Sequence, residues 1–201
     1  MHWKFWERGR DTQHDDLLSS EITLQRHYES SRKNPPASSR LIDTGLHGAI
    51  WEVPLPNREP VYMRLDRSAD ETSYAVHVDT ELYYYYWLLT SRRTSYHKCP
   101  PRQKMPLDRK YDQAVEGVEA GRRSPVPLAR PHLHIREGLV SLRFTNGLTR
   151  SMWLIANRAP SFPVEVSSLV EAQLFQHILG TDEPPIELQD RTGFFSDENE
   201  I

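Results

Sequence analysis

The chain has 201 residues, with 25 basic and 28 acidic side chains and a formal net charge of −3. This length suits one domain with a core of its own, and the single cysteine, Cys99, excludes an internal disulfide and a multi-cysteine zinc site. We therefore expect a reducing, cytoplasmic setting, and the lack of a long apolar run predicts no membrane insertion.

Residues 1–40 are predicted to form an N-terminal arm and a linker. Residues 15–30 carry apolar side chains at loosely helical spacing, whereas residues 31–40, SRKNPPASSR, have the composition of a linker. The arm is either a docked helix or a disordered segment. Aromatic side chains near its start indicate packing on this domain or on a partner.

Alternating apolar residues predict strands from residue 48 onwards. One strand ends near Leu55, a turn covers Pro56–Pro60, and a second strand runs back through Val61, Met63 and Leu65. A third strand is expected at residues 74–78.

A helix is predicted after the third strand, capped by Asp79 or Thr80. Its sequence, ELYYYYWLLTS, holds more aromatic side chains than one helix face can accommodate. Either some of Tyr84, Tyr85 and Trp87 are exposed for stacking on nucleic-acid bases, or the helix is wedged between two apolar surfaces.

Residues 92–110 form the most basic region and are predicted to be a long loop, because they are proline-rich and lack periodicity. Such a loop suits contacts with a nucleic-acid backbone, and a solvated loop without a partner fits the same pattern. The residues expected to contact DNA are Arg92, Arg93, Lys98, Arg102, Lys104 and Arg109.

Asp108 is expected to cap the next helix, which ends at Gly121. An extended segment follows at residues 125–135 and places His132 and His134 on one strand face. Two histidines do not complete a metal site and no third ligand is in obvious register, so the ligands of any metal ion stay unknown.

Residues 138–166 carry the strongest functional signal. An alternating strand, an Asn-Gly turn, a short helix capped by Thr149 and a second strand follow one another. Such a turn aims backbone N–H groups at one point, and the helix dipole adds positive character there. The positive charge of Arg150 in the first turn opposes the helix dipole, which favours a phosphate-binding role for this residue. An Asn-Gly turn is also common between a strand and a helix that bind nothing. The predicted phosphate ligands are Asn146, Gly147, Thr149 and Arg150.

Ser168 and Glu171 predict a capping box for a helix that stops at Gly180. The remaining acidic tail is predicted to be disordered, with competition against nucleic acid for the basic loop as one hypothesis for its role. The predicted organisation is an arm and linker at residues 1–40, a domain at residues 41–180 and a tail at residues 181–201.

The order of strand, NGLTR turn, helix and FPVEV strand resembles the core of the ParB/sulfiredoxin fold. The longer run Asp108–Val166, with DRKYDQAVEGVEAGRRSPVPLA ahead of that core, resembles the plasmid fertility-inhibition factor family. The resemblance implies an α+β fold with a mixed sheet flanked by helices, a flexible N-terminal arm and an acidic C-terminal tail. It also implies that the Gly147-x-x-Arg150 turn holds a nucleotide or another phosphate group.

The same resemblance implies a function: members of this family block transfer of a competing plasmid, or of T-DNA, through a type IV secretion system. It implies DNase and ATPase activities, with ATP as cofactor and transferred DNA as substrate. The coupling protein or relaxosome is the implied partner, at the inner face of the secretion channel. The predicted catalytic residues are Arg150, Asp108 and Lys110. Arg150 supplies positive charge, and Asp108, beside Lys110, is our first choice for the acid that holds a divalent metal ion such as Mg²⁺ or orients water. A plain helix cap is the other interpretation of Asp108.

Two other functions stay open. One is a noncatalytic, nucleotide-dependent DNA-binding module. The other is a protein–protein inhibitor of the coupling protein that uses the aromatic arm or exposed tyrosines, which the negative net charge favours and the local basic cluster disfavours.

Overall fold

The structure is a computed structural model that describes residues 36–45, 48–66, 72–93, 97–136 and 139–188. The predictions for the N-terminal arm, and for the tail beyond residue 188, lie outside the described residues. Within the described part, no helix combines the length and apolarity that a membrane crossing requires.

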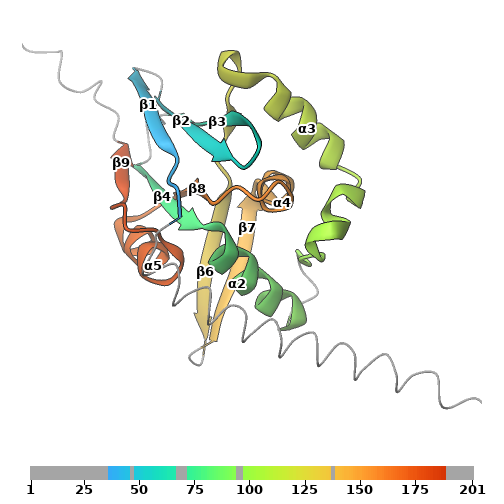
Figure 1. The fold of residues 1–201 in the computed structure, drawn as a ribbon. Coiled ribbons are helices and arrows are strands. Elements are labelled where there is room, and N and C mark those ends of the chain that lie inside the picture. The colour runs from blue at the N-terminus through green and yellow to red at the C-terminus, as the bar shows by residue number, and fades with distance from the viewer. Residues whose placement is uncertain (1–35, 46–47, 67–71, 94–96, 137–138, 189–201) are drawn as a thin grey trace, which may run out of the picture. The chain divides into compact units, whose positions relative to one another are not determined.

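A predominantly antiparallel sheet forms the first layer (Figure 1). Its strand order is β1-β2-β3-β5, with β1 Arg40–Gly45, β2 Gly48–Leu55, β3 Arg58–Asp66 and the short β5 Val126–Pro127, which alone runs parallel to its neighbour. The predicted hairpin is confirmed, but its turn is shorter than expected because Asn57 adopts a positive φ of 59° and β3 starts directly after it.

A second sheet has the order β8-β4-β9, with β4 Ser73–Asp79, β8 Ser161–Val166 and β9 Ile186–Leu188. Every residue of β4 and β8 is buried, as expected of strands covered on both faces. The prediction of a disordered tail from Thr181 was wrong for residues 181–188, because β9 pairs with β4 and Leu188 is buried.

The third sheet is a hairpin of β6 Arg130–Arg136 and β7 Leu139–Asn146. A parallel bridge between Ala129 and Val164, with the Glu165 N–H donating to the Ala129 carbonyl at 2.8 Å, ties the start of this hairpin to β8. The segment around Leu128 therefore connects the three sheets, since the Leu128 N–H also bonds the Arg64 carbonyl of β3 at 2.8 Å.

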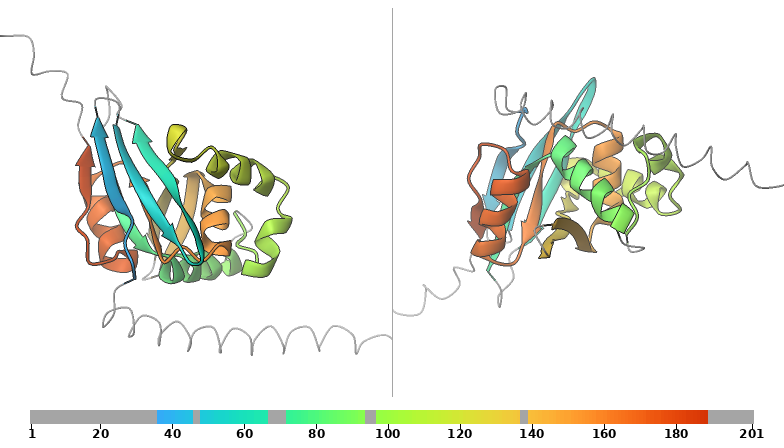
Figure 2. Two further views of the ribbon diagram at one scale, coloured as in Figure 1. Left: turned by 45° about the horizontal axis from the view of Figure 1, so that its top comes forward. Right: turned by 90° about the horizontal axis from the view of Figure 1, so that it is seen from below.

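The helices lie around these sheets. They are α2 Thr80–Arg93, η1 Arg102–Leu107, α3 Tyr111–Glu119, η2 Gly121–Arg123, α4 Leu148–Ala156 and α5 Leu169–Leu179. The views in Figures 1 and 2 agree that α3 and α5 lie on opposite sides of the sheets. The predicted α+β fold with a mixed sheet flanked by helices is confirmed.

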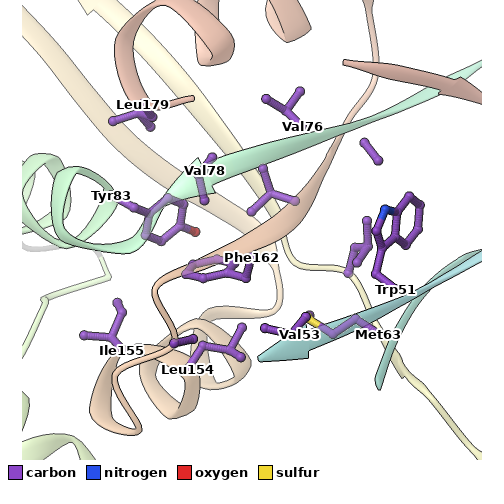
Figure 3. Packing of buried hydrophobic residues seen from close by; sticks show 14 of the residues in the cluster. Trp51, Val53, Met63, Val76, Val78, Tyr83, Leu154, Ile155, Phe162 and Leu179 are labelled. Atoms are coloured by element: carbon purple, nitrogen blue, oxygen red, sulfur yellow. The ribbon is translucent and has the colours of Figure 1, made fainter. Parts of the chain in front are cut away.

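Asp79 caps α2 as predicted, because its Oδ1 accepts hydrogen bonds from the N–H groups of Glu81 at 2.8 Å and Leu82 at 3.2 Å. Tyr83 and Trp87 of this helix are fully buried. Figure 3 shows Tyr83 and Phe162 meeting among core side chains from β2, β3, β4 and α4. Exposure of Trp87 for base stacking was therefore wrong, and the helix is wedged between apolar surfaces.

The predicted long basic loop is shorter than expected and partly ordered as helix. Arg92 and Arg93 belong to α2, and Arg102–Leu107 form the 3₁₀ helix η1. Met105 anchors η1 because its side chain is fully buried in the core. A 3₁₀ helix with an internal proline lacks the 3.6-residue period, which is why periodicity did not indicate it.

The capping box of α5 is confirmed at Ser168, whose hydroxyl accepts a hydrogen bond from the Glu171 N–H at 3.2 Å. The reciprocal contact differs by one residue, because the Glu171 carboxylate accepts from the N–H and hydroxyl of Ser167, both at 3.4 Å.

Acid is expected to destabilise this fold through His77. The ring is fully buried in β4, with its Nδ1 2.8 Å from Oε2 of Glu183. Burial lowers the pKa of His77 below 6.5, and the Glu183 carboxylate only partly opposes this shift. The unfolded chain then binds this proton more readily, so stability is complete above about pH 6.5 and declines as the pH falls toward the folded pKa.

We expect urea unfolding to show a loss of up to about 1.4 kcal/mol per pH unit from this one group. The difference in unfolding free energy between about pH 7.5 and about pH 5.5 should shrink in His77→Gln. His134→Gln is the control, because His134 is exposed. An unchanged pH difference in His77→Gln would contradict the assignment.

Candidate phosphate-binding site

An open pocket of about 480 Å³, the α4 pocket, lies where β7 passes into α4 and α3 faces them. Four predicted phosphate ligands and the predicted catalytic Lys110 come together in it. Its lining residues are His97, Lys110, Gln113, Ala114, Val126, Phe144, Thr145, Asn146, Gly147, Leu148, Thr149 and Arg150.

Helix α4 begins differently from the prediction. Gly147, not Thr149, is the N-cap, with a positive φ of 81°, and no side chain caps the helix. The first intrahelical hydrogen bond runs from the Ser151 N–H to the Gly147 carbonyl at 2.9 Å. The three preceding amides, those of Leu148, Thr149 and Arg150, therefore stand in the first helical turn beside the pocket, where an anion is favoured.

Asn146 supplies a local acceptor at this turn. Its Oδ1 accepts a hydrogen bond from the Gly147 N–H at 2.7 Å. An amide oxygen thus occupies one backbone donor, and a phosphate oxygen would replace it only if the Asn146 side chain turned away.

Arg150 is half-buried on the wall of the pocket. Burial lowers the pKa of its guanidinium from the usual value, and the nearby Glu165 carboxylate raises it again. Glu165 is itself buried, forms an ion pair with Arg130 and accepts a hydrogen bond from the Ser73 hydroxyl at 3.1 Å. An arginine stays charged in such a setting, so the pocket wall carries a fixed, partly desolvated cation.

The structure separates the two other predicted catalytic residues. Lys110 lines the pocket, whereas Asp108 does not. The Asp108 Oδ1 accepts a hydrogen bond from the Lys110 N–H at 2.9 Å and its carbonyl accepts from Tyr111 N–H at 2.9 Å, so it shapes the turn that leads into α3. The prediction that Asp108 caps this helix was wrong, because Lys110 is the N-cap of α3 and no side chain caps the helix. A metal-binding role for Asp108 stays a prediction.

Sequence reasoning missed His97, Gln113 and Thr145 as pocket residues. His97 has a positive φ of 51°, its carbonyl accepts a hydrogen bond from the Trp87 indole at 2.6 Å, and its ring meets Phe144 edge-on at 6.0 Å. A non-glycine residue in this conformation is held there by its surroundings. No local sequence pattern indicates this backbone conformation of His97, because a tertiary hydrogen bond from Trp87 holds it.

Of the residues predicted to contact DNA, the four whose side chains the structure describes do not line the pocket. Lys98, Lys104 and Arg109 are exposed, whereas Arg102 is bound to the Glu81 carboxylate and lies 5.1 Å from the centre of the Tyr84 ring. The side chains of Arg92 and Arg93 lie outside the described part. Among the residues predicted to contact DNA, Arg102 therefore has a structural role through its contacts with Glu81 and Tyr84.

The two histidines of β6 differ in their contacts. His132 Nδ1 lies 3.1 Å from Glu171 Oε1, and its Nε2 is hydrogen-bonded to Thr145 Oγ1. His134 is exposed on the same strand. Among the described residues, no group of three or more His, Cys, Asp or Glu side chains is arranged to hold a metal ion.

The chain is similar to known proteins over the region that includes this pocket. A family model described as plasmid fertility inhibition factor matches residues 75–180, which include every residue of the α4 pocket. The protein called Protein osa from Shigella flexneri is 30% identical over 161 residues, 80% of this chain and 84% of that protein.

A crystal structure of the Oncogenic Suppression Activity Protein, described as a plasmid fertility inhibition factor in a gold(I) cyanide derivative, has the same fold. It matches with a TM-score of 0.75 and 29% sequence identity, over 84% of this chain and 88% of that one. The family match starts at residue 75, well before the Asp108 at which the resemblance was visible in the sequence.

Proposed function

The chain belongs to the plasmid fertility inhibition factor family, and on this premise we propose that it blocks conjugative or T-DNA transfer through a type IV secretion system by ATP-regulated cleavage of the transferred DNA. The α4 pocket is the proposed nucleotide site. The proposed partners are the transferred strand and the coupling protein or relaxosome. A divalent metal such as Mg²⁺ is a proposed cofactor.

One observation supports this proposal above the others: Lys110, the N-cap of α3, and Arg150 of α4 line the same pocket as Asn146, Gly147 and Thr149 at the start of α4. Two cations and a helix start suit the phosphate chain of a nucleotide. The pocket is large enough for a phosphate group and part of a nucleoside, since ligand pockets span about 300–1,000 Å³.

Contact with DNA is assigned to the surface beside the pocket. Lys104 precedes Asp108 in sequence, and Arg109 lies between Asp108 and Lys110. Lys104 and Arg109 are both exposed on the segment from η1 to α3. A phosphodiester backbone held there would contact cations whose side chains have no structural task in the described contacts of the fold.

We expect the wild-type chain to cleave labelled single- or double-stranded DNA in the presence of Mg²⁺ or Mn²⁺, with a rate that changes when ATP is added. Lys104→Ala combined with Arg109→Ala should weaken DNA binding without altering ATP binding, because neither residue lines the pocket. An Arg122→Ala, Arg123→Ala chain is the matched control, since it loses two exposed arginines outside the proposed surface.

Three outcomes separate the candidates. Cleavage of DNA by the wild-type chain would support the proposed DNase activity. ATP-dependent DNA binding without cleavage, with every metal ion tested, would instead favour a noncatalytic, nucleotide-dependent DNA-binding module. Absence of both DNA binding and cleavage would leave the protein–protein inhibitor of the coupling protein.

A further inference from the structure

Three side chains from three elements form a continuous hydrogen-bonded chain beside the α4 pocket. Glu171 of α5 bonds Nδ1 of His132 at 3.1 Å, and Nε2 of His132 bonds the hydroxyl of Thr145 on β7. A carboxylate, an imidazole and a hydroxyl in this order are the arrangement that activates a hydroxyl nucleophile.

For a neutral His132, the contacts select one tautomer. An ionised carboxylate only accepts hydrogen bonds, so Nδ1 donates its proton to Glu171. Nε2 is then the unprotonated nitrogen, and it accepts the hydrogen bond from the Thr145 hydroxyl. The imidazole is thus oriented to remove the Thr145 proton.

Thr145 occupies an irregular position in its strand. The β6–β7 register pairs Arg130 with Asn146 and Pro131 with Phe144, which leaves Thr145 as an extra residue opposite no partner on β6. Burial along β7 still alternates here, with Phe144 buried and Thr145 exposed, so Thr145 lies on the same face as Arg143, the cross-strand partner of His132. Thr145 also lines the α4 pocket, one residue before the Asn146-Gly147 turn.

If the only role of His132 were to hold α5 against the β6–β7 hairpin, its contact with Glu171 would be enough. That role would not require a second bond from the imidazole to a residue of the pocket. The His132 side chain is 43% exposed, whereas that of Glu171 is 16% exposed. The imidazole can therefore pass a proton to water after taking it from Thr145.

We propose that Thr145 is a phosphoryl-accepting nucleophile, with His132 as its general base and Glu171 as a positioning residue. This inference rests on the proposed nucleotide-binding function of the α4 pocket. The terminal phosphoryl group of a nucleoside triphosphate is the group transferred, and Arg150 with the first-turn amides of α4 binds its oxygens.

The step balances as follows. The Thr145 oxygen forms a bond to the terminal phosphorus while His132 Nε2 takes the hydroxyl proton. The bond from that phosphorus to the bridging oxygen breaks, and its electron pair leaves with the nucleoside diphosphate. His132 releases this proton to solvent. Water then bonds to the phosphorus of the phosphothreonine while His132 takes a proton from it, the bond from phosphorus to the Thr145 oxygen breaks, and that oxygen takes the proton from His132 as inorganic phosphate leaves.

The test follows ATP, labelled at its terminal phosphate, with the full chain and Mg²⁺. Rapid quenching and peptide mass analysis should find one added phosphoryl group on Thr145, and ATP turnover is measured in the same samples. Thr145→Val keeps the shape and removes the hydroxyl, whereas Thr145→Ser keeps the hydroxyl. Ser141→Ala removes another hydroxyl from the same strand as the control.

We expect adduct and turnover in the wild type, Thr145→Ser and Ser141→Ala, and neither in Thr145→Val. His132→Gln should lower the turnover rate by about a hundredfold or more with little change in ATP affinity. Glu171→Gln should lower the turnover rate by a similar factor. A glutamine whose oxygen still accepts the bonds at the start of α5 turns its amide N–H groups toward Nδ1, so Nε2 carries the proton and cannot act as the base.

Two results would overturn the inference while leaving the proposed nucleotide site intact. One is wild-type ATP binding without adduct or turnover. The other is adduct or turnover that persists in Thr145→Val or is unchanged in His132→Gln. Failure of the wild type to bind ATP would instead overturn the proposed nucleotide site, and with it this inference.

Discussion

Replacement of Arg150 by alanine is expected to weaken ATP binding by about 10- to 100-fold. A charge-assisted hydrogen bond between a guanidinium and a phosphate contributes about 1.5–3 kcal/mol, which corresponds to this range. Arg150 is half-buried, so its charge is screened less by water than the charge of the exposed Lys110 on the facing wall. Calorimetric titration with ATP and Mg²⁺ measures the change.

The matched control is Arg130→Ala. Arg130 and Arg150 both act on the buried Glu165, but only Arg150 lines the α4 pocket. Arg130→Ala therefore reproduces the loss of one cation near Glu165 without removing a pocket residue. Equal losses of ATP affinity in the two variants, or unchanged affinity in Arg150→Ala with a native circular dichroism spectrum, would show that Arg150 has only a structural role.

Arg150→Lys adds a second comparison. Lysine keeps the positive charge but loses the planar fork that binds two phosphate oxygens at once. We expect an affinity between those of the wild type and Arg150→Ala. An ATP affinity of Arg150→Lys equal to that of the wild type would mean that the positive charge alone, and not the shape of the guanidinium, matters at this position.

The sequence predicted the local order around the site well because that order depends on short-range patterns. Alternation identified β7, and the Asn-Gly pair identified the turn into α4. The cap was misassigned because Thr149 is a residue type that commonly caps helices, whereas Gly147 starts the helix through its backbone conformation. The helix began earlier than the side-chain signal indicated.

Long-range contacts were beyond the reach of such patterns. Glu165 lies in a strand buried on both faces, so alternation gave no sign that its carboxylate is enclosed between Arg130 and Ser73. The chain from Glu171 through His132 to Thr145 joins residues up to 39 positions apart, and the cross-strand register that brings His132 and Thr145 together exists only in the paired hairpin.

The error in the tail has a similar cause. Residues 181–188 are acidic and rich in proline, which is typical of disordered segments. Three residues suffice for β9 because β4 provides a preformed edge, and the Thr181 N–H bonds the His77 carbonyl of that strand at 2.9 Å. A strand this short carries too few residues for alternation to register.

Replacement of Gly147 by alanine is expected to destabilise the fold by about 3 kcal/mol and to abolish tight ATP binding. The positive φ of 81° costs an alanine about 1–2 kcal/mol. The added methyl group would also lie 2.5 Å from the Ala129 Cα and 3.0 Å from Nη2 of Arg150. Because the closest atom belongs to backbone, relief of the overlap must shift the turn against the segment that connects the sheets, at a further cost of about 1–3 kcal/mol.

Gly121→Ala separates these two contributions. Gly121 also has a positive φ, of 61°, but nothing lies within 4 Å of the position that an added methyl group would take. We expect Gly121→Ala to lose only about 1–2 kcal/mol and to bind ATP normally. Urea unfolding of both variants therefore measures backbone strain alone in one and strain plus overlap in the other.

The ATP affinity of the Gly147 variant must be measured under conditions where it is folded, because loss of the fold alone would remove binding. At low temperature and without denaturant, a loss of about 3 kcal/mol leaves a protein of ordinary stability mostly native. Weak ATP binding by folded Gly147→Ala would then show that the close approach of the turn to Ala129 sets the positions of the first-turn amides and of Arg150. Normal stability and normal binding would contradict the packing at this turn and the phosphate site built on it.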